Sequence, residues 1–129
     1  MTYIQHKSEE SIEDYLETIL MLGEIRPVVR SIDIANELHY SKPSVSVAMK
    51  NLRAKDYITV SEEGYISLTK EGKKIAEKVY ERHKVLSEWL INLGVEKVTA
   101  VTDACRMEHD MSPESFFAMK KFIEEHSAG

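Results

Sequence analysis

A cysteine, a glutamate and a histidine lie near residue 105 at a spacing that suits coordination of a metal ion. Cys105 precedes Glu108 and His109 by three and four residues, and residues at these separations are neighbours on one face of a helix. Thiolate, carboxylate and imidazole groups are all ligands of divalent transition metals. This C-x-x-E-H pattern therefore indicates a metal-binding cluster, although a lone cysteine is often simply a small buried apolar residue.

Three more potential ligands lie elsewhere in the chain. Asp14 and Glu17 are three residues apart on a helix expected over about residues 8–22, so their side chains share a face. His83 lies in the middle of a later helix whose other residues are mostly apolar or charged. The two carboxylates could instead be solvated first-turn charges, and His83 could be an ordinary hydrogen-bonded histidine. As ligands from separate helices, these side chains would let one ion clamp two parts of the chain together.

The composition is that of an ordinary globular protein. The 129 residues are 43% hydrophobic and 30% charged, and the longest aliphatic run, Ile19-Leu20-Met21-Leu22, is far shorter than the roughly 20 residues that span a bilayer. The N-terminus lacks the apolar stretch of a secretion signal. The single cysteine excludes an intramolecular disulfide and suits a reducing compartment. We therefore expect a cytoplasmic protein.

Two short helices and a tight turn are expected between residues 31 and 54. Ser31 is expected to cap the first helix, which ends near Leu38, and Ser41 to cap the second, with Pro43 in its first turn. This arrangement is typical of a helix-turn-helix. The apolar positions of the second helix recur at helical spacing and form one buried face: Val45, Ala48, Met49 and Leu52.

A β-hairpin is expected directly after these helices. Residues 57–60 and 65–68 are β-branched or aromatic runs that flank a polar turn containing Gly64. A hairpin at this place in a helix-turn-helix protein is a wing. Thr69 is then expected to cap a long helix that ends near Gly94.

The predicted fold class is mainly α with a small β wing. We expect a winged helix-turn-helix DNA-binding domain over residues 1–74 and an all-helical dimerisation and metal-binding domain over residues 75–129, with helices at about 96–111 and from Ser112 onward. The last helix is more apolar than so short a chain requires for one protomer. Its apolar residues are candidates for a dimer contact, although about half of them could instead belong to the core of one protomer. These residues are Phe116, Phe117, Met119, Phe122 and Ile123.

The distribution of charge matters more for DNA binding than its sum. A net charge of −5 argues mildly against contact with phosphates, but residues 42–55 carry four basic residues and no acidic one. The alternative is an α+β interaction module with no role in nucleic-acid binding. The outward positions of the second short helix and its cap are the candidates for contacts with bases and phosphates: Ser41, Lys42, Pro43, Ser44, Ser46, Val47, Lys50 and Asn51.

Five segments of the sequence resemble those of a known protein family. They read EDYLETI at residues 13–19, SKPSVS at 41–46, LTKEG at 68–72, RHKVL at 82–86 and DACRMEH at 103–109. Together they resemble the diphtheria toxin repressor and manganese transport regulator family of metal-dependent transcriptional repressors, over roughly residues 8–125. The resemblance implies a homodimer that binds Fe(II) or Mn(II) and then grips a palindromic operator of metal-uptake genes.

The resemblance also implies a ligand set of mixed character. Asp14 and Glu17 follow the manganese-type pattern, whereas Cys105 matches the iron-type branch. Ser87 and Val101 stand where the iron-type branch has an ancillary site, and they are poor ligands. A thiolate favours Fe(II) and added carboxylates favour Mn(II), and we expect a slight preference for Fe(II). The positions that match the main metal site are Asp14, Glu17, His83, Cys105, Glu108 and His109.

The function predicted from the sequence is therefore a metal-dependent repressor and not an enzyme. One alternative is a winged-helix regulator that responds to a small ligand or to oxidation of Cys105. A remote alternative is a small metal-dependent hydrolase built on Glu108 and His109, for which the sequence offers no separate general base and no oxyanion donor. A purely structural adaptor would show no salt-sensitive binding to DNA.

Overall fold

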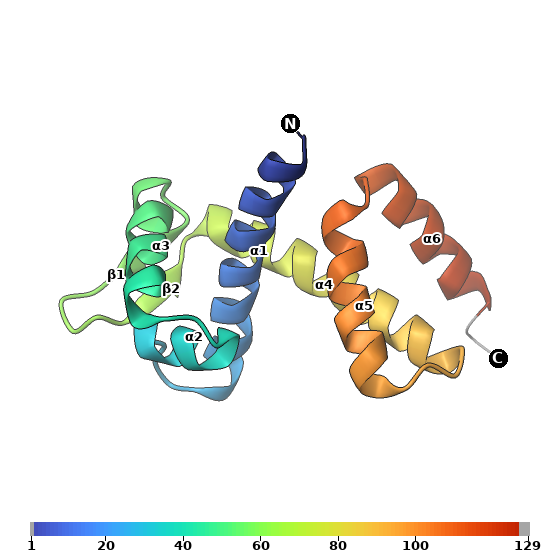
Figure 1. Cartoon of the computed structure of the whole chain (residues 1–129), viewed down its shortest axis with the longest axis horizontal. Helices are drawn as coiled ribbons and strands as arrows, with labels where there is room; N and C mark the ends of the chain where they lie inside the picture. The colour runs from blue at the N-terminus through green and yellow to red at the C-terminus, as the bar shows by residue number, and fades with distance from the viewer. Residues whose placement is uncertain (1, 127–129) are drawn as a thin grey trace. The chain divides into compact units, whose positions relative to one another are not determined.

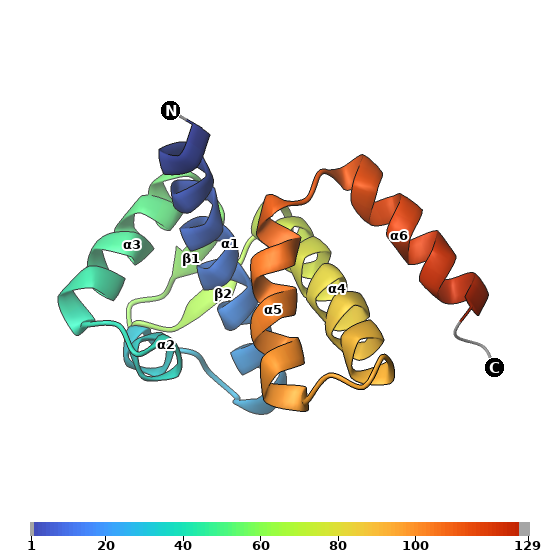
Figure 2. The same cartoon turned by 45° about the vertical axis from the view of Figure 1, so that its right-hand side comes forward.

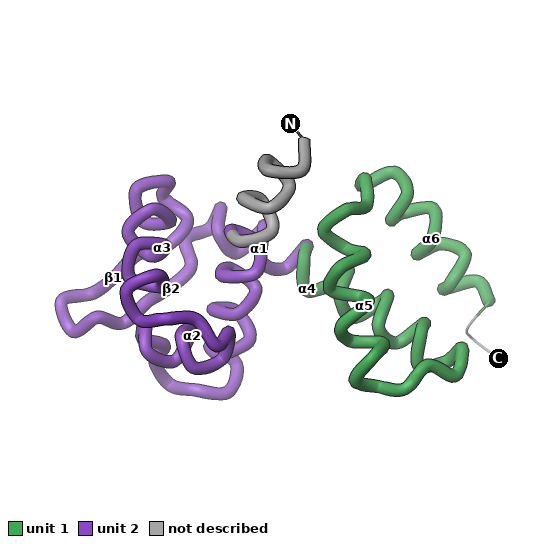
Figure 3. The backbone as a smooth tube through the Cα atoms, in the orientation of Figure 1, with its two compact units in different colours: residues 1–6, 79–129 green, residues 7–78 purple. Residues whose placement is uncertain are grey.

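A computed structural model describes the backbone of residues 2–126 and the side chains of residues 12–126. The chain is mainly helical, with one two-stranded antiparallel sheet, as the sequence predicted (Figure 1). It divides into two compact units, residues 7–78 and residues 1–6 with 79–129 (Figure 3). The elements in order are α1 (Thr2–Ile25), α2 (Ser31–Leu38), α3 (Lys42–Ala54), β1 (Ile58–Val60), β2 (Ile66–Leu68), α4 (Lys70–Asn92), α5 (Lys97–Asp110) and α6 (Pro113–His126).

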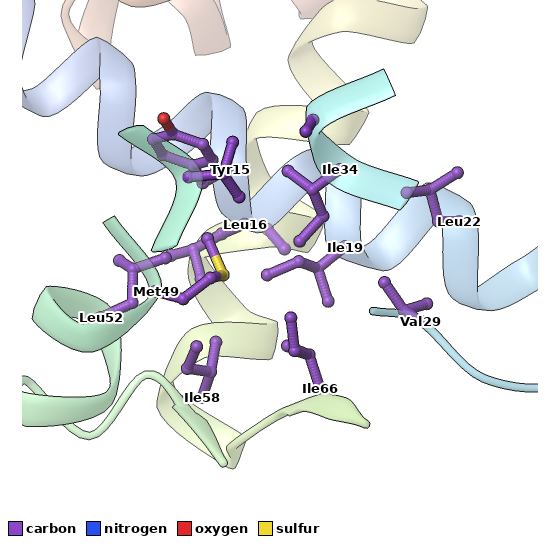
Figure 4. Close-up of a cluster of buried hydrophobic side chains, with 13 residues drawn as sticks. Tyr15, Leu16, Ile19, Leu22, Val29, Ile34, Met49, Leu52, Ile58 and Ile66 are labelled. Atoms are coloured by element: carbon purple, nitrogen blue, oxygen red, sulfur yellow. The ribbon is translucent and has the colours of Figure 1, made fainter. Parts of the chain in front are cut away.

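The unit of residues 7–78 has a hydrophobic core of its own (Figure 4). Leu16 of α1, Ile34 of α2 and Val45 of α3 are fully buried, and Ile58 and Ile66 add the inner face of the hairpin. The apolar residues of each helix recur three and four positions apart, which places them on one face. The core therefore joins α1, α2, α3 and the hairpin into one body.

The predicted hairpin is confirmed, and it is tied to the segment that follows α1. Ile58 pairs with Leu68 and Val60 with Ile66 in the antiparallel register. Gly64 has a φ of 85°, a left-handed conformation that glycine adopts without strain. The Ile66 amide also donates to the carbonyl of Val29 at 2.8 Å. This bond fixes the wing against the chain between α1 and α2.

The start of α4 is anchored to the turn that precedes β1. Thr69 caps the helix as predicted, because its Oγ1 accepts from the Gly72 amide at 3.1 Å. The same hydroxyl donates to the carbonyl of Asp56 at 2.7 Å, and the Thr69 amide donates to the carbonyl of Tyr57 at 3.0 Å. The first turn of α4 therefore lies directly against the backbone of residues 56 and 57.

The second unit is built from the later part of α4 with α5 and α6, and α5 runs back beside α4 (Figure 2). Its core consists of Leu86 from α4, Ala104 from α5 and Phe116 from α6. An ion pair between Glu81 and Lys120 also joins α4 to α6. Each of the three helices therefore contacts another through apolar or charged side chains.

Of the predictions about the ends of α1, α2 and α3, two were wrong and the cap of α3 was confirmed. α1 spans residues 2–25 rather than about 8–22, since no glycine or proline precedes Gly23 to interrupt it. α2 is capped by Arg30 rather than Ser31, because the Asp33 carboxylate accepts from the Arg30 amide at 2.9 Å. Ser41 does cap α3, since its Oγ accepts from the amide of Ser44.

Among the glycines that the structure describes, Gly72 has the closest neighbouring backbone. A Cβ at Gly72 would lie 2.0 Å from the carbonyl oxygen of Tyr57, so the anchored start of α4 would have to shift. We expect Gly72→Ala to lower the free energy of unfolding by about 1–3 kcal/mol. The matched control is Gly23→Ala in α1, where a Cβ meets nothing within 4 Å and stability should rise by about 0.5–1 kcal/mol. Urea unfolding measures both, and equal effects would contradict the close approach.

Candidate functional site

The donor groups of the C-x-x-E-H pattern lie together on the last two turns of α5. The Nε2 atom of His109 is 3.8 Å from the Sγ of Cys105 and 3.6 Å from Oε1 of Glu108. Two ligands held at about 2.0–2.3 Å from one ion lie roughly 3–4 Å from each other. Both distances therefore fit coordination of a single divalent transition metal, with an imidazole nitrogen at the centre of the set.

His83 brings a fourth donor from α4 within the same unit. A ring nitrogen of His83 and a carboxylate oxygen of Glu108 lie within 4.8 Å of each other. His83 is half-buried, so it is not a fully exposed surface histidine. The unit of residues 79–129 thus assembles two imidazoles, one carboxylate and one thiol from two helices.

The Glu108 carboxylate is buried, so its negative charge must be compensated by neighbouring groups. Glu108 is 2% exposed, and the side chain of His109 is 4% exposed. Removing a carboxylate from water is costly unless a positive charge or strong hydrogen bonds compensate it. A proton on His109 is one source of compensation, and a bound divalent cation is a stronger one. The donor set and its surroundings both fit such an ion.

The two carboxylates predicted on the first helix lie on α1, in the unit of residues 7–78. Asp14 is half-buried and Glu17 is 6% exposed, so neither belongs to a freely solvated face. Burial of Tyr15, together with Tyr40 and Asp14, raises the pKa of the Tyr15 phenol. The rings of Tyr15 and Tyr40 meet edge to face at 5.9 Å. Asp14 therefore lies on a well-packed part of α1.

α3 presents its polar side outward, as a DNA-reading helix requires. Val45, Met49 and Leu52 are buried, whereas Val47 is 59% exposed. The Ser41 hydroxyl donates to the Ser44 hydroxyl at 2.9 Å, which orders the start of the helix. Every residue predicted to contact DNA is exposed: Ser41, Lys42, Pro43, Ser44, Ser46, Val47, Lys50 and Asn51.

Sequence reasoning overlooked a contact that holds the wing. The guanidinium of Arg30 lies over the ring of Tyr65, 4.9 Å from its centroid, and donates to the Tyr65 hydroxyl at 3.2 Å. Arg30 caps α2 and Tyr65 precedes β2, so the pair joins the helix-turn-helix to the hairpin. The sequence separation of 35 residues left no local pattern by which to find it.

The apolar residues of α6 divide into two groups. Phe116 is 3% exposed and Ile123 is 9% exposed, so both belong to the interior. Phe117 and Phe122 are 61% and 54% exposed, and Met119 is half-buried. Two aromatic rings on one short helix therefore face outward.

Among the described residues, no helix is long and apolar enough to cross a membrane.

Two family models together match nearly the whole chain. Residues 8–70 match the N-terminal DNA-binding domain of iron-dependent repressors. Residues 69–127 match the metal-binding and dimerisation domain of the same family. The two matches confirm the resemblance that the sequence segments indicated.

Individual relatives agree with the family models. The transcriptional regulator MntR of Escherichia coli O6:H1 is 37% identical over 121 residues, which cover 92% of this chain and 77% of the relative. The regulator MntR of Bacillus subtilis is 33% identical and covers 79% of this chain and 72% of the relative. The structure of the manganese regulator SloR matches with a TM-score of 0.78 and 28% identity over 88% of this chain. This chain spans about half of that longer chain, 53%.

The family consists of DNA-binding transcriptional regulators and not of enzymes. This finding removes the hydrolase alternative and supports a winged helix-turn-helix that is followed by a helical domain. The donor cluster on α5 and the outward polar face of α3 each lie in the part of the chain that the corresponding model covers. The chain belongs to the iron-dependent repressor family of metal-dependent transcriptional regulators.

Proposed function

We propose that this protein is a homodimeric repressor of metal-uptake genes that binds palindromic operator DNA when Fe(II) or Mn(II) is bound. The observation that carries the proposal is the partly buried donor cluster on α5, in which Cys105 and Glu108 lie 3.8 Å and 3.6 Å from the same nitrogen of His109. That cluster lies in the segment matched by the family's metal-binding domain.

The proposed metal site draws its ligands from three helices. α5 and α4 supply four donors, and α1 supplies two carboxylates. The complete proposed set is Asp14, Glu17, His83, Cys105, Glu108 and His109. An ion held in this way favours the arrangement in which these helices are docked, and so shifts the population towards it. Coupling of about 1–3 kcal/mol would change operator affinity about 5- to 150-fold.

In this proposal residues 1–74 form the DNA-binding domain and also supply the ligands Asp14 and Glu17. Residues 75–129 form the dimerisation and metal-binding domain, which supplies the other four ligands. The exposed side of α3 from Ser41 to Asn51 would enter the major groove, with Lys50 among its contacts. A two-fold dimer places two such helices about 34 Å apart, one turn of the duplex. Phe117 and Phe122 on α6 are the proposed dimer contacts. The cytoplasm, where DNA is present and thiols stay reduced, is the proposed location.

Fe(II) is the proposed activating ion because of the thiolate of Cys105. Sulfur ligands favour softer ions, whereas carboxylates such as Glu108 suit Mn(II). The relatives from Escherichia coli and Bacillus subtilis carry the name MntR, and the matched solved structure is titled a manganese regulator. Those names favour manganese, so the choice between the two ions depends on what Cys105 contributes.

Removing two ligands should abolish activation by metal. In Glu108→Ala/His109→Ala, the cluster loses its carboxylate and its central imidazole, so metal should no longer strengthen binding to DNA. The DNA is a palindromic fragment selected from a random library by the metal-loaded protein. Gel shift with and without Fe(II) or Mn(II) measures activation, and ultracentrifugation should still find a dimer. The control is Glu88→Ala, which removes an exposed carboxylate from α4. Retained activation in the double variant would show that Glu108 and His109 are not the activating ligands.

Lys50 should contribute to DNA affinity and not to metal affinity. In Lys50→Ala, one phosphate contact is lost, so the slope of log K against log salt should fall by about 1 in magnitude. Calorimetric titration with metal in the absence of DNA should be unchanged. Lys121→Ala removes the same charge from an exposed position on α6 and serves as the control. An equal salt slope in the two variants would contradict the role of α3.

Cys105 should decide the preference between the two ions. Replacing the thiol with a carboxylate in Cys105→Glu should lower the ratio of Fe(II) affinity to Mn(II) affinity about tenfold, or about 1.4 kcal/mol. Anaerobic calorimetry with each ion measures the ratio. The control is Cys105→Ser, which removes the thiolate without adding a carboxylate and should weaken Fe(II) more than Mn(II). An unchanged ratio in both variants would exclude sulfur coordination.

A further inference from the structure

Arg82 is a buried arginine of α4 that contacts both α5 and α6. The residue lies on α4 and is 7% exposed. Its Nη1 donates to the carbonyl of Glu108 and to the carbonyl of Met111, each at 3.3 Å. Its guanidinium also lies over the ring of Phe116, 5.2 Å from the centroid. One side chain of α4 thereby joins the end of α5 to the beginning of α6.

The two carbonyls explain why a cation is stable in this place. α5 ends at Asp110, and Met111 has an extended backbone with φ −97° and ψ 134°. The last carbonyls of a helix have no partner within the helix and carry the negative end of its dipole. Arg82 satisfies one such group, the carbonyl of Glu108, together with the carbonyl of the extended Met111, and thereby compensates part of the cost of its own burial. A planar guanidinium can do so while it stacks on an aromatic ring, which an ammonium group does less well.

Arg82 is also linked to the metal ligands on two sides. It directly precedes His83 in the sequence, and one of its acceptors is the backbone of Glu108 itself. Successive residues of a helix point about 100° apart. The direction of Arg82 towards α5 therefore determines the direction of His83. The same contact also sets the position of α4 along the axis of α5. These two helices carry His83 and Glu108, whose donor atoms lie within 4.8 Å of each other.

We infer that Arg82 is a positioning residue of the metal site, which sets the separation of His83 from Glu108 and His109 before any ion binds. The inference rests on the proposed function of this cluster. Arg82 does not touch the ion; it acts through the backbone of Glu108 and through the rotation of α4. Outer groups that orient ligands in this way typically contribute 10- to 100-fold to metal affinity. Its contact with Phe116 extends the same constraint to α6.

The test is a titration of the full chain with Co(II), followed by absorption, under reducing conditions. In Arg82→Met the affinity for Co(II) should fall about 10- to 100-fold. In Arg82→Lys, which keeps the charge but loses the planar fork, the affinity should fall by a smaller factor. The Co(II) absorption bands at saturation should differ from those of the unaltered protein in both variants, since the geometry of the ligands has changed. Arg106→Met, which removes an exposed arginine from α5, should match the unaltered protein.

Thermal unfolding without metal separates positioning from mere stability. Variants that melt at a lower temperature but keep the affinity and the spectrum would overturn the inference. If Arg82→Met does not fold, Arg82→Lys decides the question by the same two measurements. If the variants and the unaltered protein bind Co(II) equally well, Arg82 is not a positioning residue, and the proposed metal site still stands. Absence of Co(II) binding by the unaltered protein would overturn the metal site and, with it, the role of Arg82.

Discussion

A charged carboxylate is buried at the end of α5, and its burial must be compensated. Glu108 is almost entirely removed from water, and His109 lies 3.6 Å from its carboxylate. Such a group is stable only when positive charge or strong donors surround it. A divalent ion would supply that charge in a way that depends on metal concentration. In our proposal, this pair of residues responds to the supply of metal.

Each unit of the chain has its own hydrophobic core, and this limits what a metal ion can do. The core around Leu16 and Val45 lies wholly within residues 7–78, and the core around Leu86 and Phe116 lies wholly within residues 79–129. Neither core contains a proposed ligand. In our proposal the main effect of the ion is therefore a shift in population between arrangements of the chain.

Periodicity and capping made much of the fold predictable from sequence. The buried face of α3 follows from apolar residues three and four apart, and its outward positions were correctly identified as exposed. Ser41 and Thr69 were correctly identified as caps because a cap is a local interaction, over three residues. The hairpin followed from two β-prone runs and a glycine turn. Ser31 failed as a cap because Asp33 engages the preceding amide instead.

The potential metal donors of α5 and the polar face of α3 could be predicted from the sequence alone, since both depend on neighbours within about one helical turn. The sequence could not predict that Phe116 is interior while Phe117 is exposed, or that Arg82 contacts the end of α5. These outcomes depend on contacts between helices far apart in sequence. Arg82 and Glu108 are 26 residues apart, and no spacing rule connects a side chain to a carbonyl at that separation.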